Sequence, residues 1–207
     1  MRSKQTKVQL PEFLPGDILL FAGKKGDRYT RLADWVMRAG GEGPTYAVHT
    51  AQFLDSRRVL EMDYKVKIKS IEDILNKRVD LNTWERRGFE VWRYRTLSEE
   101  QREALTDQAL RYINVRFGYL KMIAHLVDGL IDKVTHRHLY LFRRLDPDGS
   151  SPVCSGVTAF VYDKALHYRF GVEPECADPD HIHDWVVAHP EEWERVFVLN
   201  DYGALSA

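Results

Sequence analysis

The chain has 207 residues, of which 44% are hydrophobic and 29% are charged, and its formal net charge is −1. These values are ordinary for one soluble globular domain, and they exclude disordered and fibrous proteins. The balanced charge lacks the basic surplus that nucleic-acid-binding proteins usually show, so we expect no nucleic-acid partner.

The sequence also bears on the compartment. No apolar run reaches the roughly 18 residues that a transmembrane helix needs, and the basic N-terminus leads into Pro11 and Pro15 instead of an apolar segment. Two cysteines, Cys154 and Cys176, are too few for a disulfide framework. We therefore expect no transmembrane segment and no signal peptide, and a cytoplasmic protein with reduced thiols. Delivery by a phage or export by another route stays open.

The first half of the chain predicts mainly strands. A buried strand is expected over 17–22, a hairpin over 46–54 and 59–64 with its turn at 55–58, and another strand over 89–95. Apolar residues at helical spacing predict a helix over 32–39, and Ser70 is expected to begin a short one.

The second half predicts mainly helices. Ser98 and Gln101 form a capping-box pattern, and 119–134 and 154–166 are expected to be helical. Asp178-Pro179 is typical of a helix start, and 195–199 of a last strand. Strands followed by helices, without a separating linker, indicate a single α+β domain over residues 1–207.

Cys154 is the residue that most suggests chemistry. It follows a turn and begins an apolar helix, where the partial positive charge of the helix end and the unpaired N–H groups favour a thiolate. A catalytic cysteine also needs a base within reach. The alternative is a buried cysteine that acts only as a small apolar side chain.

His49 and Glu61 are the candidates for the base and for the group that orients it. His49 lies in a mostly apolar strand, and Glu61 lies in the returning strand, where a carboxylate is costly unless it is paired. The turn decides whether they meet. A two-residue turn pairs Gln52 with Glu61 and puts His49 on the opposite face, whereas a three-residue turn pairs Phe53 with Glu61 and puts both on one face. The sequence leaves both registers open.

These residues resemble a known family. The order of Pro15-Gly-Asp-Ile-Leu-Leu-Phe, a strand histidine, a glutamate twelve residues later and Pro152-Val-Cys-Ser is similar to that of the circularly permuted branch of the NlpC-type cell-wall peptidase superfamily. This branch includes YiiX/YaeF-like amidases and lecithin retinol acyltransferase-like proteins. The resemblance implies a permuted papain-like α+β fold, with an antiparallel sheet packed against helices and the cysteine at a helix N-terminus.

The same resemblance implies roles for residues. Cys154 is expected to be the nucleophile, His49 the general base and Glu61 the orienting residue, without a metal or a cofactor. Ser155, Phe117 and Tyr119 are candidates for the oxyanion site or the substrate pocket. Two features depart from the family: Gly156 stands where an acidic residue is common, and the segment 121–151 is long enough to be an insertion.

Three functions compete on this evidence. The first is a cysteine hydrolase, an amidase or peptidase that cleaves an amide in a cell-wall stem peptide or another amino-acid-containing compound through an acyl-enzyme. The second is an acyltransferase or lipid esterase with the same covalent step, and the third is a binding or phage structural protein without catalysis. A metal site among Asp178, Asp180, His181, His183 and Asp184 is the less favoured interpretation, because helix capping explains the aspartates. The oligomeric state does not follow from the sequence.

Overall fold

The computed structural model describes residues 10–22, 46–62, 64–79, 88–116, 118, 127–128, 131, 135 and 152–199. Its elements, in chain order, are β1 (Ile18–Ala22), β2 (Ala47–Phe53), β3 (Arg58–Met62), β4 (Val66–Ser70), α2 (Ile71–Val79), β5 (Phe89–Tyr94), α3 (Glu99–Leu110), α5 (Cys154–Leu166), the 3₁₀ turn η2 (Pro174–Cys176), α6 (Pro179–Ala188) and β6 (Trp193–Leu199). The expected α+β class is therefore confirmed. The expected helix over 32–39 lies outside the described residues, and within the expected helix over 119–134 only residues 127–128 and 131 are described, all of them helical.

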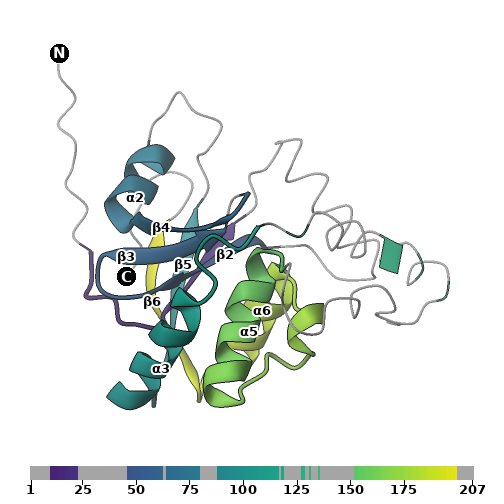
Figure 1. Ribbon diagram of the computed structural model, residues 1–207. Coiled ribbons are helices and arrows are strands. Elements are labelled where there is room, and N and C mark those ends of the chain that lie inside the picture. Colours follow the sequence, from purple (N-terminus) through teal and green to yellow (C-terminus); the bar gives the residue numbers. More distant parts are fainter. Residues whose placement is uncertain are drawn as a thin grey trace.

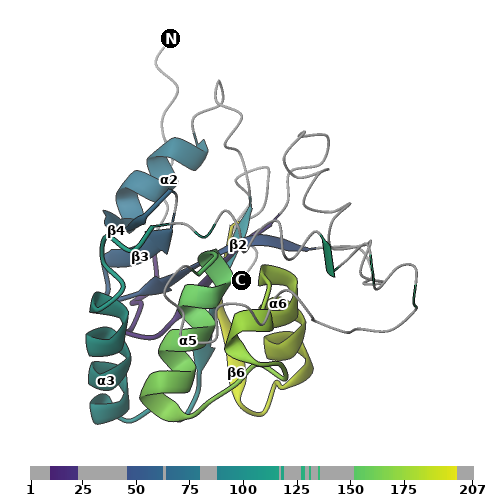
Figure 2. The same cartoon turned by 45° about the vertical axis from the view of Figure 1, so that its right-hand side comes forward.

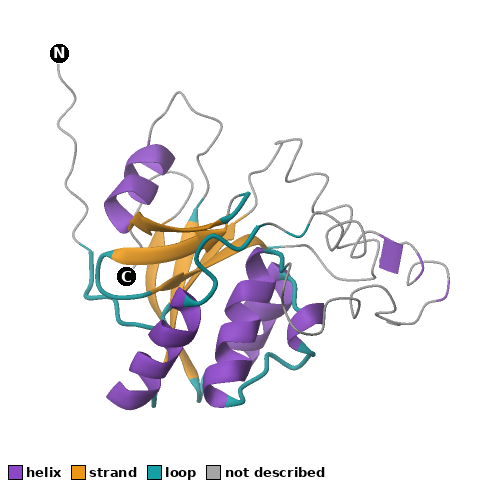
Figure 3. Ribbon diagram, in the orientation of Figure 1, coloured by secondary structure: helices purple, strands orange, loops and turns teal. Residues whose placement is uncertain are grey.

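The strands form one six-stranded sheet in the order β4-β3-β2-β1-β5-β6. Every neighbouring pair is antiparallel. Figure 3 shows the strands as a single orange layer with helices on both sides. β4 was not expected from the sequence, and the returning hairpin strand ends at Met62, short of the expected residue 64.

Helices cover the two faces of the sheet unequally. α3, α5 and α6 lie on one side, and α2 lies on the other beside β4 (Figures 1 and 2). Two separate clusters of buried apolar side chains correspond to these faces, one including Leu20, Phe160 and Ile182, the other Phe21, Ile71 and Phe89. The sheet is thus buried on both faces by apolar packing, which is the main favourable contribution to folding.

The helix starts form as the sequence predicts. The Ser98 hydroxyl accepts from the Gln101 N–H at 3.3 Å, and the Gln101 side chain accepts from the Ser98 N–H at 2.9 Å, which completes the capping box. The Asp178 carboxylate accepts from the His181 N–H at 2.9 Å and caps α6. Ser70 caps α2 in the same way through the Asp73 N–H at 2.9 Å. Each bond satisfies a backbone donor that the helix itself leaves unpaired.

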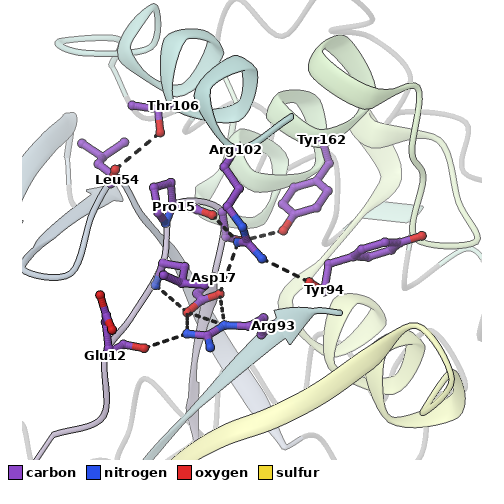
Figure 4. A network of polar contacts seen from close by, with 11 residues as sticks. Glu12, Pro15, Asp17, Leu54, Arg93, Tyr94, Arg102, Thr106 and Tyr162 are labelled. Carbon is purple, nitrogen blue, oxygen red and sulfur yellow. Dashed lines mark hydrogen bonds and ion pairs between the residues drawn. The ribbon is translucent and has the colours of Figure 1, made fainter. Parts of the chain in front are cut away.

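A buried ionic network fixes the segment before β1. Asp17, which is fully buried, accepts three hydrogen bonds from Arg93 of β5, the shortest at 2.7 Å, and one from the Leu14 N–H at 2.9 Å. Arg102 of α3 donates to the Pro15 carbonyl at 2.8 Å. Figure 4 shows both guanidinium groups converging on this turn. The network ties the sheet to α3, and its pairing offsets the cost of burying Asp17.

The hairpin between β2 and β3 adopts a register that the sequence did not distinguish. Glu61 pairs with Ala51, whereas the two registers considered from the sequence pair it with Gln52 or Phe53. The Asp55 carboxylate accepts from the backbone N–H groups of Arg57 and Arg58 at 2.9 and 2.7 Å, and this local bonding stabilises a three-residue loop over 55–57. Glu61 therefore shares a face with Ala51, and His49, two residues before Ala51, lies on that same face. A three-residue loop over 56–58 would also place His49 and Glu61 on one face.

Candidate active site

Cys154 is the first residue of α5. The preceding residue, Val153, occupies the N-cap position and makes no side-chain capping bond. The first hydrogen bond of the helix runs from the Val157 N–H to the Val153 carbonyl at 3.1 Å, so the N–H groups of residues 154–156 are not used within the helix. The half-buried thiol therefore lies beside backbone donors that favour a negative charge.

His49 lies near the start of β2 at an irregularity of the sheet. Phe21 pairs with His49 but Ala22 pairs with Ala47, so Val48 is skipped and forms a bulge. Such a bulge bends a strand and re-aims its side chains, and bulges are frequent beside active sites. The imidazole stacks on the Phe21 ring with centroids 5.2 Å apart, which restricts its orientation.

Glu61 holds the imidazole from the next strand. Its Oε1 lies 3.1 Å from Nε2 of His49, as the shared face predicts. Its other oxygen, Oε2, lies 2.9 Å from the Lys69 ammonium of β4. Burial raises the pKa of Glu61, but the bonds and charges of His49 and Lys69 outweigh burial and lower it to about 2. The carboxylate is therefore ionised throughout the neutral range.

The Cys154 thiol and the His49 ring shift each other's pKa through their charges and a side-chain hydrogen bond. Burial raises the pKa of Cys154, but the His49 charge and this bond lower it below its ordinary value. Backbone hydrogen bonds from Thr50 and Ser155 lower it further. Burial lowers the pKa of His49, but the Cys154 charge, the Cys154 bond and the Glu61 carboxylate raise it to about 9. A thiolate beside an imidazolium is the arrangement that these directions favour.

The Ser155 hydroxyl makes a bond within the protein interior. It is completely buried and donates to the Ala177 carbonyl at 2.9 Å, which ties α5 to the segment before α6. The hydroxyl is therefore engaged in a structural bond. What Ser155 contributes to the site is its backbone N–H, which bonds the Cys154 sulfur.

The other pocket candidates, Phe117 and Tyr119, lie outside the described residues. Gly118, between them, is described, and its N–H donates to the Pro152 carbonyl at 3.0 Å. This bond places Gly118 beside the turn that leads into Cys154.

Gly156 lies close to the turn that precedes Cys154. A Cβ at this position would lie 3.2 Å from the Cβ of Pro152, closer than most real Cβ contacts. An acidic side chain here would require the turn before Cys154 to shift.

A group that could hold a metal lies on α6. The ligand atoms of Asp180, His183 and Asp184 are within 4.8 Å of one another. Asp180, however, already accepts from the Tyr46 and Ala47 N–H groups at 2.8 and 3.1 Å, and Asp184 is 79% exposed. His183 stacks on the Tyr46 ring. Together these contacts attach α6 to the start of β2, two residues before His49, so we assign them to positioning that strand.

Sequence reasoning missed two contributors to the site, Lys69 and Asp180. Lys69 was missed because β4 was not expected, although the alternation in Val66-Lys-Ile-Lys-Ser is a strand signal. Asp180 was considered only as a cap or a metal ligand, and its bond to the backbone of β2 depends on the packing of α6 against the sheet.

Comparison with known proteins gives a distant likeness. No family model and no curated protein matches the chain. A solved structure that does match is that of the metalloprotein yiiX from Escherichia coli O157:H7, with 19% sequence identity and a TM-score of 0.49. The match covers 77% of this chain and 69% of that chain.

None of the helices in the described part of the chain combines the length and the apolar character that crossing a membrane requires.

Proposed function

We propose that this protein is a cysteine hydrolase that cleaves an amide bond through an acyl-enzyme. The observation that carries the proposal is the chain of contacts from Cys154 through His49 to Glu61, at a helix start with available N–H groups. A nucleophile, a base in contact with it and a third group that orients the base are the parts that acyl transfer needs. By the family resemblance, Cys154 is the nucleophile.

In the proposed reaction His49 holds the proton of the Cys154 thiol, and the thiolate attacks the carbonyl carbon of the amide. The oxyanion that forms is stabilised by backbone N–H groups at the start of α5, and such donors contribute about 3–4 kcal/mol each elsewhere. His49 then protonates the leaving amine, and the acyl group remains on the sulfur as a thioester. Water, deprotonated by His49, releases the acid and restores the thiol.

The substrate class in this proposal is a cell-wall stem peptide or another amino-acid-containing amide. The acyltransferase and lipid-esterase alternatives use the same covalent step and differ in the acceptor or the acyl chain. The test is therefore to trap the acyl-enzyme. The protein is incubated with stem peptides, N-acyl amino-acid amides and short-chain lipid esters, quenched in acid and mapped by mass spectrometry.

The proposal predicts an acyl adduct on the peptide that contains Cys154, and its loss in Cys154→Ala and His49→Ala. Cys176→Ala is the matched control, because Cys176 is buried in η2 and should leave the adduct unchanged. Adducts from lipid esters alone would favour the second function. No adduct from any class, together with an unreactive thiol, would favour the binding-protein function.

A further inference from the structure

Glu61 makes two bonds with different partners. Its Oε1 faces the His49 imidazole at 3.1 Å, and its Oε2 faces the Lys69 ammonium at 2.9 Å. The side chains of Glu61 and Lys69 are only 7% and 20% exposed. An ion pair this far from water is screened little, so its geometry matters more than that of a surface pair.

The sheet fixes Lys69 in this place. β4 pairs antiparallel with β3, with Lys67 opposite Glu61 and Lys69 opposite Val59. Since alternate residues of a strand point to one face, the side chains of Lys67 and Lys69 share the face of Glu61. Lys67 lies with its ammonium 3.8 Å from the centre of the Tyr64 ring, whereas Lys69 reaches the carboxylate.

We propose that Lys69 is a positioning residue, which holds Glu61 so that the carboxylate keeps His49 oriented toward Cys154. The inference rests on the proposed function, because it assigns Lys69 to the same site. A carboxylate bonded only through Oε1 can rotate about its last side-chain torsion, which is broad, and a second bond at Oε2 restricts that rotation. Lys69 touches neither the thiol nor a substrate in this role.

Two effects of Lys69 on His49 oppose each other, and they can be separated. The charged groups around Glu61 are His49 from β2 and the two lysines of β4, with Cys154 of α5 on the far side of His49. The positive charge of Lys69 by itself disfavours an imidazolium. The bond from Lys69 to Glu61 favours an imidazolium, because this bond keeps the carboxylate beside Nε2 of His49. Removal of Lys69 therefore lowers the pKa of His49 if positioning dominates, and raises it if the charge alone acts.

The experiment compares Lys69→Met, Lys69→Arg and the matched control Lys67→Met by NMR titration of the His49 ring. The rate of Cys154 alkylation by iodoacetamide at pH 6 is measured in the same proteins. We expect Lys69→Met to lower the pKa of His49 and to slow alkylation about five-fold, the size expected for one partly buried ion pair. Lys69→Arg should restore both, and Lys67→Met should change neither. A raised or unchanged pKa of His49 in Lys69→Met would overturn the proposal.

The double variant Glu61→Gln/Lys69→Met completes the test. If Lys69 acts through Glu61, the double variant should alkylate no more slowly than Glu61→Gln alone, whereas independent effects would multiply. If Lys69→Met does not fold, Lys69→Arg keeps the charge at Oε2 of Glu61 and carries the test; an unchanged pKa of His49 and an unchanged alkylation rate in both Lys69→Arg and Glu61→Gln would overturn the proposal. The NMR titration needs no substrate, so these results are distinct from the failure to find an acyl-enzyme.

Discussion

Replacement of Glu61 by glutamine should destabilise the protein in a way that depends on pH. The pKa of Glu61 is lowered from 4.5 to about 2 in the folded protein. At 1.36 kcal/mol per pKa unit, this corresponds to about 3 kcal/mol in favour of the folded state when the carboxylate is ionised. Because the folded-state pKa is depressed, the contribution is complete above about pH 5 and is lost as the pH falls toward 2. At pH 3 about 1.5 kcal/mol should remain.

The assay is urea denaturation of the parent and Glu61→Gln at pH 7 and at pH 3. The loss of unfolding free energy should be about 3 kcal/mol at pH 7 and about half of that at pH 3. Glu72→Gln removes an exposed carboxylate from α2 without touching the site, and its effect should be small at both values. An equal loss at both pH values for Glu61→Gln would refute the argument, because the stabilisation would then not come from the charge.

Two further substitutions test the parts of the fold that position the site. Gly16→Ala should lower the free energy of unfolding by about 1–3 kcal/mol, because Gly16 has a φ of 88° and a Cβ there would lie 2.7 Å from Leu105 Cδ1. Urea denaturation measures this loss, and an unchanged midpoint would contradict the prediction. Ser155→Ala should cost about 1–3 kcal/mol by leaving the buried Ala177 carbonyl without its donor, yet Cys154 should keep its alkylation rate. A large loss of Cys154 alkylation in folded Ser155→Ala would show that the Ser155 hydroxyl acts in the site.

The sequence predicted the local features well, because local chemistry determines them. Ser98, Asp178 and Ser70 cap the helices expected of them, and each cap needs only residues within one turn. The same is true of the start of α5 at Cys154, where a turn precedes an apolar run.

What could not be predicted depends on contacts between distant elements. The hairpin register depends on Asp55 bonding two backbone N–H groups, and an aspartate in a turn can bond in several ways. The hydroxyl of Ser155 could have faced a pocket or the protein interior, and only the position of the Ala177 carbonyl decides between them. Lys69 reaches Glu61 only because β4 pairs with β3.

The reactivity of Cys154 as a function of pH tests the central claim most directly. The parent, His49→Ala and Glu61→Gln are alkylated with iodoacetamide from pH 5 to pH 9, and modification of each cysteine is followed by peptide mass spectrometry. The depressed pKa of Cys154 predicts rapid alkylation that persists at mildly acidic pH, and buried Cys176 should react slowly throughout. His49→Ala should move the Cys154 profile to higher pH, because burial then acts on the thiolate without the opposing imidazolium. An ordinary thiol profile for Cys154 that does not respond to His49→Ala would contradict the assignment of a catalytic cysteine.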